Sequence, residues 1–196
     1  MNQIAVFASG EGSNADWIFR YFKDHDTVKV STLYCNKAGA PVLEKAFKRG
    51  IPVKLFNKEE LNNKDLILKD LIEKKIDLIV LAGFLWLIPE KIIEEFDSRI
   101  INIHPSLLPK YGGEGMYGSK VFEEVLKNKD KMSGITIHYV NKKFDEGEII
   151  YQAKCRVEKD ETLESLAAKV HRLEHHYYPI VIERILKEQD QIRELL

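Results

Sequence analysis

Short apolar segments alternate with longer amphipathic segments along most of the chain, and this alternation constrains the fold more than any other feature. Residues 4–8 are all apolar, and after a Gly-rich stretch the side chains of Ala15, Ile18, Phe19 and Phe22 recur at helical spacing. Repeated alternation of strand and helix predicts an α/β protein with a mostly parallel, doubly wound sheet. We expect parallel strands near 4–8, 28–34, 52–55, 77–82 and 99–103, with further helices near 38–49, near 59–74 and from residue 89.

The pattern changes after about residue 132. Two long segments, 134–140 and 148–157, flank the polar turn NKKFDEG, and this arrangement predicts an antiparallel hairpin that extends the sheet. A long C-terminal helix is expected from about 162 to 187. With 196 residues, 44% of them hydrophobic, and no linker or internal repeat, the sequence predicts one domain around one core.

The charge balance and the two cysteines exclude several classes of protein. Thirty Lys and Arg residues stand against 31 Asp and Glu, so the chain lacks the basic excess that nucleic-acid binding requires. Cys35 and Cys155 have no C-x-x-C spacing, which argues against a disulfide framework or a zinc site. The first residues do not resemble a leader, and no apolar segment approaches the roughly 18 residues that span a bilayer. We therefore expect a cytoplasmic protein without nucleic-acid or membrane partners.

A Gly-rich loop, residues 9–14, follows the first predicted strand and precedes a helix. Glycines allow close backbone approach, and the N–H groups of the helix N-terminus can bind a phosphate. The spacing of Gly10, Gly12 and Ala15 also matches the looser dinucleotide fingerprint G-x-G-x-x-A. However, the second strand ends in residues 35–37, Cys-Asn-Lys, where a dinucleotide site needs an acidic side chain. A tight turn without a ligand remains the alternative.

The fifth predicted strand ends in two polar residues at alternate positions. Because strand side chains alternate, Asn102 and His104 should project from one face, with Ile101 and Ile103 on the other. The following Pro105 ends the strand and stiffens the loop. An amide and an imidazole then meet at the strand end, where open α/β sheets bind ligands. The alternative is a capping histidine beside a structural asparagine.

Four other residues could carry chemistry. Asp145 lies in the polar turn of the hairpin, where a solvated turn is the default unless a histidine lies nearby. Glu174 borders the apolar stripe of the last helix, and a carboxylate there is either paired or binds a ligand. His171 and His175 have the i, i+4 spacing of metal ligands, but no third ligand is apparent, so we expect no metal.

Four segments together resemble the folate-dependent formyl transferases. They are SGEGSN at 9–14, LAGFLWLIP at 81–89, INIHPSLLPKYGG at 101–113 and DEGEIIYQ at 145–152. The resemblance extends over nearly the whole chain, and the third segment is the most specific. It implies a single-domain, Rossmann-like formyl transferase fold.

The resemblance also implies a division of labour and a set of site residues. Within one formyl transferase domain, 1–196, the part from about 1–100 would bind phosphate, and the part from about 101–196 would bind folate and carry out catalysis. The implied catalytic residues are Asn102, His104 and Asp145. The implied residues for the substrate phosphate are Gly10, Gly12, Ser13 and Asn14, with Glu174 for the ribose hydroxyls. The implied folate-binding residues are Leu85, Trp86, Leu87, Ile88, Asn102, Val140, Asn141 and Lys142.

The phosphate loop and the compact length resemble the purine-pathway members of this family. Their reaction transfers a formyl group from 10-formyltetrahydrofolate to the amine of glycinamide ribonucleotide, without a metal, in a monomer or homodimer. Asn102 and protonated His104 would donate hydrogen bonds to the formyl oxygen, and Asp145 would raise the pKa of His104.

Related activities remain as alternatives. A formyltetrahydrofolate deformylase would use the same groups on water but usually carries an extra N-terminal domain, and a methionyl-tRNA formyltransferase needs a C-terminal RNA-binding domain. A phosphate-binding module without catalytic activity is the alternative from another class.

Three departures from the family pattern affect how ligands are held. Trp86 stands where relatives often carry an Arg that can meet the glutamate tail of the folate. Residues 110–118 resemble a variant form of the loop that follows the central motif, and Glu146 replaces a common Gly. None of these changes affects Asn102, His104 or Asp145.

Overall fold

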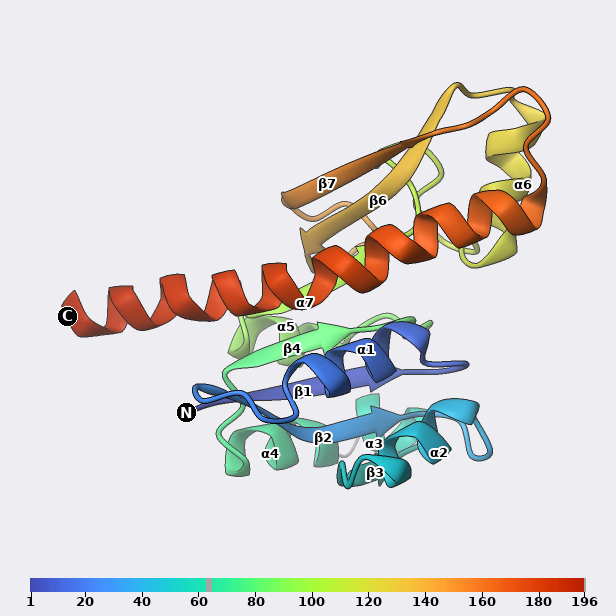
Figure 1. The fold of residues 1–196 in the computed structure, drawn as a ribbon. Helices are drawn as coiled ribbons and strands as arrows, with labels where there is room; N and C mark the ends of the chain where they lie inside the picture. The colour runs from blue at the N-terminus through green and yellow to red at the C-terminus, as the bar shows by residue number, and fades with distance from the viewer. Residues whose placement is uncertain (63–64, 196) are drawn as a thin grey trace.

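A seven-stranded mixed sheet forms the centre of the protein, as a computed structural model that describes residues 1–62 and 65–195 shows (Figure 1). The strands lie in the order β3-β2-β1-β4-β5-β6-β7, and all neighbours from β3 to β5 are parallel. The last two strands are antiparallel. This confirms the predicted doubly wound sheet with a C-terminal hairpin. The strands are β1 (Asn2–Ala8), β2 (Val28–Cys35), β3 (Val53–Leu55), β4 (Leu78–Leu81), β5 (Ile100–His104), β6 (Met132–Tyr139) and β7 (Ile149–Arg156).

Helices cover both faces of the sheet, because the central strand is apolar on both sides. In β1, Ile4, Val6 and Ala8 belong to one hydrophobic cluster, and Ala5 and Phe7 belong to the cluster on the opposite face. The first face is covered by α1 (Ser13–Tyr21), α2 (Pro41–Lys48), α6 (Ser119–Lys127) and α7 (Leu163–Leu195). The second face is covered by α3 (Lys58–Asn62), α4 (Leu66–Glu73) and α5 (Glu90–Glu95).

The structure differs from the sequence analysis at three places in the helices. The single helix predicted over 59–74 is wrong: α3 and α4 are separate, and Asp65 has φ 50°, which a right-handed helix does not allow. Helix α6 was not predicted from the sequence. Helix α7 continues past the predicted end at residue 187, because tertiary contacts hold its charged end, such as the hydrogen bond from Asn2 Nδ2 to Asp190 Oδ2 at 2.7 Å.

The order in which strands are added to the sheet reverses between β1 and β4: β2 and β3 lie on one side of β1, and β4 and the later strands lie on the other. This reversal opens a crevice at the C-terminal ends of β1 and β4. The loop after β1 and the loop after β4 meet there: Ser9 N–H donates to the Gly83 carbonyl oxygen at 3.1 Å, and Leu85 N–H donates to Ser9 Oγ at 3.1 Å. Behind the crevice, the buried Tyr178 hydroxyl of α7 donates to the Leu81 carbonyl oxygen at 2.9 Å. Such a switch point is where open α/β sheets bind ligands.

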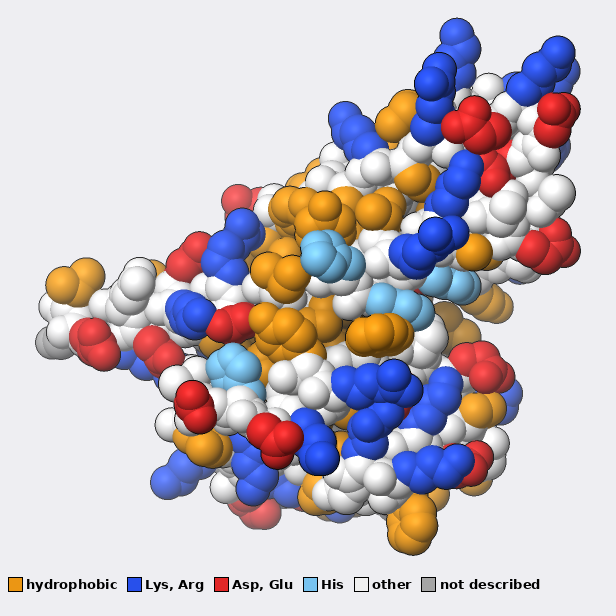
Figure 2. All heavy atoms as spheres, viewed as in Figure 1, with side chains coloured by type: hydrophobic (Ala, Val, Ile, Leu, Met, Phe, Trp, Pro, Cys, Tyr) orange, Lys and Arg blue, Asp and Glu red, His pale blue; other side chains and the backbone are white. Residues whose placement is uncertain are grey.

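The surface agrees with the balanced composition. Figure 2 shows basic and acidic side chains interspersed over one face, with hydrophobic side chains gathered where α7 and the hairpin approach the body. Among the described residues, no helix has the length and apolar character needed to cross a membrane.

Candidate active site

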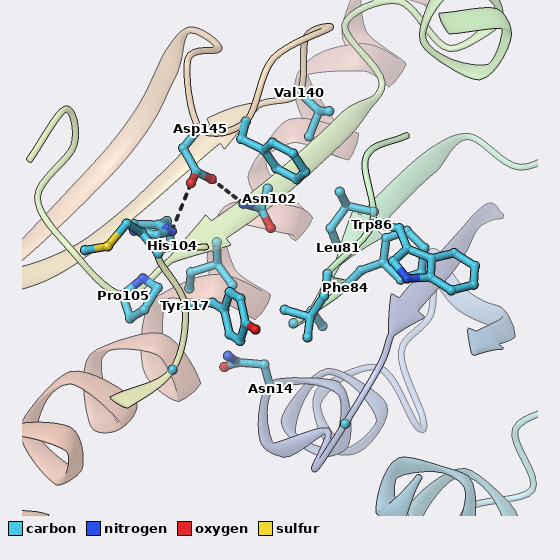
Figure 3. A pocket seen from close by; sticks show the side chains of 18 of the residues that line it. Asn14, Leu81, Phe84, Trp86, Asn102, His104, Pro105, Tyr117, Val140 and Asp145 are labelled. Carbon is cyan, nitrogen blue, oxygen red and sulfur yellow. Dashed lines mark hydrogen bonds and ion pairs between the residues drawn. The ribbon is translucent and has the colours of Figure 1, made fainter. Parts of the chain in front are cut away.

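A pocket of about 570 Å³ occupies the crevice at the C-terminal ends of β1, β4 and β5 (Figure 3). The Gly-rich loop 10–14 lines one part of it, and the apolar segment 81–88 lines another. Asn102 lies near the middle of the pocket, with His104 and Asp145 beside it on the side away from Trp86. The pocket therefore brings together residues from all four segments that the sequence analysis singled out.

Asn102 and His104 point into the pocket from β5, and both reach Asp145, which lies 41 residues beyond His104 in the sequence (Figure 3). Nδ1 of His104 is 3.5 Å from Oδ2 of Asp145, and Nδ2 of Asn102 is 3.4 Å from Oδ1. The predicted shared face of Asn102 and His104 is confirmed. The solvated turn is wrong for Asp145, whose side chain is 10% exposed.

The hairpin loop holds Asp145 in place through backbone geometry. Asp145 itself has φ 56°, a left-handed conformation that Asp tolerates better than most residues. The N–H of Gly113 donates to its Oδ2 at 2.9 Å. A Cβ on Gly147 would lie 1.7 Å from the Tyr139 carbonyl oxygen, so only glycine fits at this point of the turn. Together these contacts hold the Asp145 carboxylate in place.

The electrostatics of His104 differ from the sequence expectation. Burial lowers the pKa of His104, and this effect exceeds the opposing influence of Asp145 and of the Tyr111 carbonyl oxygen, which lies 2.7 Å from Nε2. The expected rise of the His104 pKa above its ordinary value is therefore wrong. Asp145 acts in the expected direction, but a carboxylate at 3.5 Å does not compensate for removing the imidazolium from water.

Asp145 is an anion in this site. Burial by itself would raise the pKa of Asp145, but the nearby imidazoles of His138 and His104 and the Gly113 N–H lower it, and their influence is larger. The site therefore combines an ionised carboxylate with a neutral imidazole at pH 7.

The Gly-rich loop leads into α1 through a left-handed residue. Gly12 has φ 66° and precedes the first residue of the helix, so Ser13 and Asn14 lie in the first turn, with N–H groups available to an anion. A Cβ on Gly12 would lie 2.2 Å from Cγ2 of Val42 in α2. Asn14 is buried, and its Oδ1 has no hydrogen-bond partner among the described residues. An unpaired buried oxygen that lines a pocket fits a ligand contact.

Comparison with known proteins decides the family. The sequence pattern described as formyl transferase matches residues 2–182, nearly the whole chain. The chain belongs to the formyl transferase family. The phosphoribosylglycinamide formyltransferase of Bacillus subtilis is 36% identical over 191 residues, which are 95% of each protein. The chloroplastic enzyme of the same name from Arabidopsis thaliana is 40% identical over 98% of this chain and 68% of its own length.

Solved structures agree with this assignment. The crystal structure of phosphoribosylglycinamide formyltransferase from Anaplasma phagocytophilum has a TM-score of 0.86 and 35% identity, over 95% of this chain and 88% of that one. The corresponding structure from Bacillus halodurans has a TM-score of 0.84 and 35% identity, over 94% and 95% of the two chains. The fold of this formyl transferase is therefore the fold of those proteins.

Glu174 of this formyl transferase is nearly fully buried in α7 at the edge of the pocket. Burial raises the pKa of Glu174 to about 7, and a hydrogen bond with Asn14 opposes the rise. Nε2 of His171 lies 4.0 Å from Oε2 of Glu174. With a pKa near 7, the carboxyl group can be protonated at neutral pH, and in that form it both donates and accepts hydrogen bonds.

Most of the predicted folate-binding residues line the pocket, but two do not. Leu85, Trp86, Leu87, Ile88 and Val140 all contribute to its wall.

The two exceptions make contacts outside the pocket. Oδ1 of Asn141 accepts a hydrogen bond from the Lys143 N–H at 2.9 Å, and Lys142 forms ion pairs with Glu90 and Glu94 of α5. The structure therefore does not bring these two side chains into the site.

His138 is a site residue that the sequence analysis missed. It lies opposite Asn102 in the antiparallel register of β5 and β6, and its Nε2 is 3.6 Å from Oδ1 of Asp145. Its Nδ1 donates to the Tyr139 carbonyl oxygen at 2.8 Å. A register for the hairpin would have revealed it, because cross-strand partners share a face.

The sequence analysis also missed other residues that line the pocket. Phe84, Tyr117 and Phe144 line the pocket; they lie in segments that the sequence analysis quoted, but were not named there as site residues. Within residues 1–62 and 65–195, no three His, Cys, Asp or Glu side chains come together as metal ligands would. His175 stacks on Trp17, with ring centroids 5.4 Å apart.

Proposed function

We propose that this formyl transferase transfers a formyl group from 10-formyltetrahydrofolate to the amine of glycinamide ribonucleotide, as the names of its relatives indicate, in purine biosynthesis. Members of the family use formyl-tetrahydrofolate as co-substrate. The observation that carries the proposal is the meeting of Asn102, His104 and Asp145 in one pocket that a phosphate-type loop and an apolar wall also line.

The glycinamide ribonucleotide fits the polar part of the pocket. The loop Gly10, Gly12, Ser13 and Asn14 would hold its phosphate through backbone N–H groups at the start of α1. Glu174 would bind the ribose hydroxyls, since its carboxyl group lies beside Asn14 at the edge of the same pocket. The acceptor amine would then extend toward Asn102 and His104.

The folate fits the apolar part. A flat pterin ring requires an apolar wall with a few polar contacts, and Leu85 to Ile88 together with Val140 supply that wall. The bound folate supplies the formyl group. Asn141 and Lys142 stay a prediction, because their side chains make contacts outside the pocket.

His104 would move the proton of the reaction. In the neutral ring Nε2 donates to the Tyr111 carbonyl oxygen, so Nδ1 presents a lone pair toward Asp145 and the pocket. Nδ1 accepts a proton from the amine as the amine attacks the formyl carbon, and returns it to the nitrogen that the formyl group leaves. Asp145 stabilises the imidazolium that exists between these two steps.

Asn102 would stabilise the negative charge that develops on the formyl oxygen. One N–H of its Nδ2 is held by His138 at 3.1 Å, and the other faces Asp145 over a long 3.4 Å. Because its contact with Asp145 is long, this second N–H can donate instead to the formyl oxygen when negative charge develops there. None of these steps calls for a metal ion, and much of the acceleration comes from holding the two reactants in place.

The proposal covers the whole chain as one domain, 1–196. The part from about 1–100 contributes the phosphate loop, and the part from about 101–196 contributes Asn102, His104, Asp145 and Glu174. The enzyme would act on small molecules in the cytoplasm, as a monomer or homodimer, without nucleic acid.

A coupled assay tests the function. Purified protein with 10-formyltetrahydrofolate and glycinamide ribonucleotide should yield tetrahydrofolate and the formylated amine in equal amounts. Formate released at the same rate without the amine would identify a deformylase instead. Calorimetric binding of glycinamide ribonucleotide without turnover would identify a phosphate-binding module.

A further inference from the structure

The loop between β5 and α6 carries an aromatic side chain into the pocket. Tyr117 belongs to segment 110–118, which departs from the family pattern. Figure 3 shows its ring between Asn14 of the phosphate loop and the His104–Pro105 strand end, with the hydroxyl directed into the pocket.

Three glycines determine where Tyr117 lies. Gly113, Gly115 and Gly118 all have positive φ angles, of 98°, 83° and 59°. Gly118 follows Tyr117 directly and combines φ 59° with ψ −136°, a conformation that side-chain-bearing residues rarely adopt. The chain turns into α6 at that point, so the conformation of Gly118 sets the direction of the residue before it.

The Tyr117 side chain is held from one side and open on the other. Nζ of Lys120 lies 5.4 Å from the ring centroid, a cation–π contact that keeps the ring over the pocket. The residue is 47% exposed, and none of the residues in the described part of the chain hydrogen-bonds its hydroxyl. The hydroxyl is thus a donor that faces the place where a ligand would lie.

We propose that Tyr117 binds the acceptor substrate: its hydroxyl donates a hydrogen bond to the ribose-phosphate part, and its ring covers that part of the pocket. This inference rests on the proposed function. The acceptor is the better partner because Tyr117 lies beside Asn14, whereas Trp86 and Val140 of the apolar wall lie on the other side of Asn102 (Figure 3). The positive charge of Lys120 next to the ring also favours an anionic ligand.

Steady-state kinetics of Tyr117→Phe test the hydrogen bond. Loss of one donor to the substrate should raise KM for glycinamide ribonucleotide by roughly 3- to 10-fold, while KM for the folate stays within about 2-fold. Tyr117→Ala also removes the ring and should raise the same KM further. Tyr21→Phe is the matched control, since Tyr21 is 41% exposed, donates to Glu183 and does not line the pocket. It should leave both KM values unchanged.

Gly118→Ala provides an independent test that keeps the tyrosine. A Cβ there meets no described atom within 4 Å but strains the backbone, so Tyr117 should be displaced without loss of folding. The acceptor KM should rise in Gly118→Ala, and the effect should disappear in the Tyr117→Ala background.

Two outcomes overturn the inference. Unchanged acceptor KM in Tyr117→Phe and Tyr117→Ala, with wild-type activity otherwise intact, shows that Tyr117 does not contact the acceptor. Equal rises of both KM values assign it to the folate or to loop structure. Absence of formyl transfer in the wild type is a separate result, because it contradicts the proposed function before any variant is compared.

Discussion

Nδ2 of Asn102 lies 3.1 Å from Nε2 of His138, its cross-strand partner. Because Nδ1 of His138 donates to the Tyr139 carbonyl oxygen, Nε2 is the ring nitrogen that accepts from the Asn102 amide. The imidazole therefore orients the asparagine, so that the second N–H of Nδ2, and not the carbonyl oxygen, faces Asp145.

His138→Leu removes this acceptor and should lower kcat about 10-fold, because the Asn102 amide is then free to rotate. His138→Gln can still accept a hydrogen bond and should retain more activity. Steady-state kinetics of both variants check the prediction, and equal rates in the two would show that His138 does not orient Asn102.

Asn102→Ala and His104→Ala should each lower kcat by about 100- to 1000-fold, with KM values within a few-fold of wild type. Their hydrogen bonds and proton transfer matter mainly as charge develops in the transition state. Circular dichroism would establish that each variant folds. A kcat within a few-fold of wild type for either variant would contradict the proposed mechanism.

Asp145→Asn removes the charge beside His104 and nearly keeps the shape, including an oxygen for the Gly113 N–H. Because Asp145 raises the pKa of His104 against the opposing effect of burial, the variant should shift the His104 titration to lower pH. Turnover should fall about 100-fold. NMR of the imidazole resonances measures the titration, and identical curves would show that Asp145 is not the partner of His104.

Glu174→Gln should change how stability depends on pH. Glu174 has a pKa of about 7 in the folded protein against an ordinary value of 4.5, so its contribution is fully present below about pH 4.5 and is lost as pH rises through 7. This difference corresponds to roughly 3 kcal/mol. Part of this energy is already lost at pH 5, so urea unfolding at pH 5 and pH 8 should show the wild type losing roughly 2.5 kcal/mol more free energy of unfolding than the variant. Parallel losses would mean that Glu174 is charged at pH 5 in the folded state.

Gly12→Ala should destabilise the fold, whereas Gly10→Ala in the same loop should not. A Cβ on Gly12 meets Val42 at 2.2 Å in a left-handed backbone conformation, while a Cβ on Gly10 meets no described atom within 4 Å. We expect a loss of about 2 kcal/mol or more for Gly12→Ala and less than about 0.5 kcal/mol for Gly10→Ala. Urea unfolding measures both, and equal stabilities would contradict the packing argument.

The sequence by itself determined the elements whose signal is local. The apolar runs of β1 and β4 predict buried parallel strands, because such strands are covered on both faces. The alternation of residues 101–104 placed Asn102 and His104 on one face, since side chains alternate along any strand. The Gly-rich loop after β1 was equally local, and the family motif linked these segments.

Only the tertiary structure decided what depends on distant parts of the chain. Asp145 meets His104, and His138 meets Asn102, because β6 pairs antiparallel with β5 in one register. The pKa of His104 falls because the fold buries the ring, and no neighbour in sequence reports how much water remains around it. Burial and strand register arise from the packing of the whole chain, so local patterns predicted the groups of the site but not their charge states.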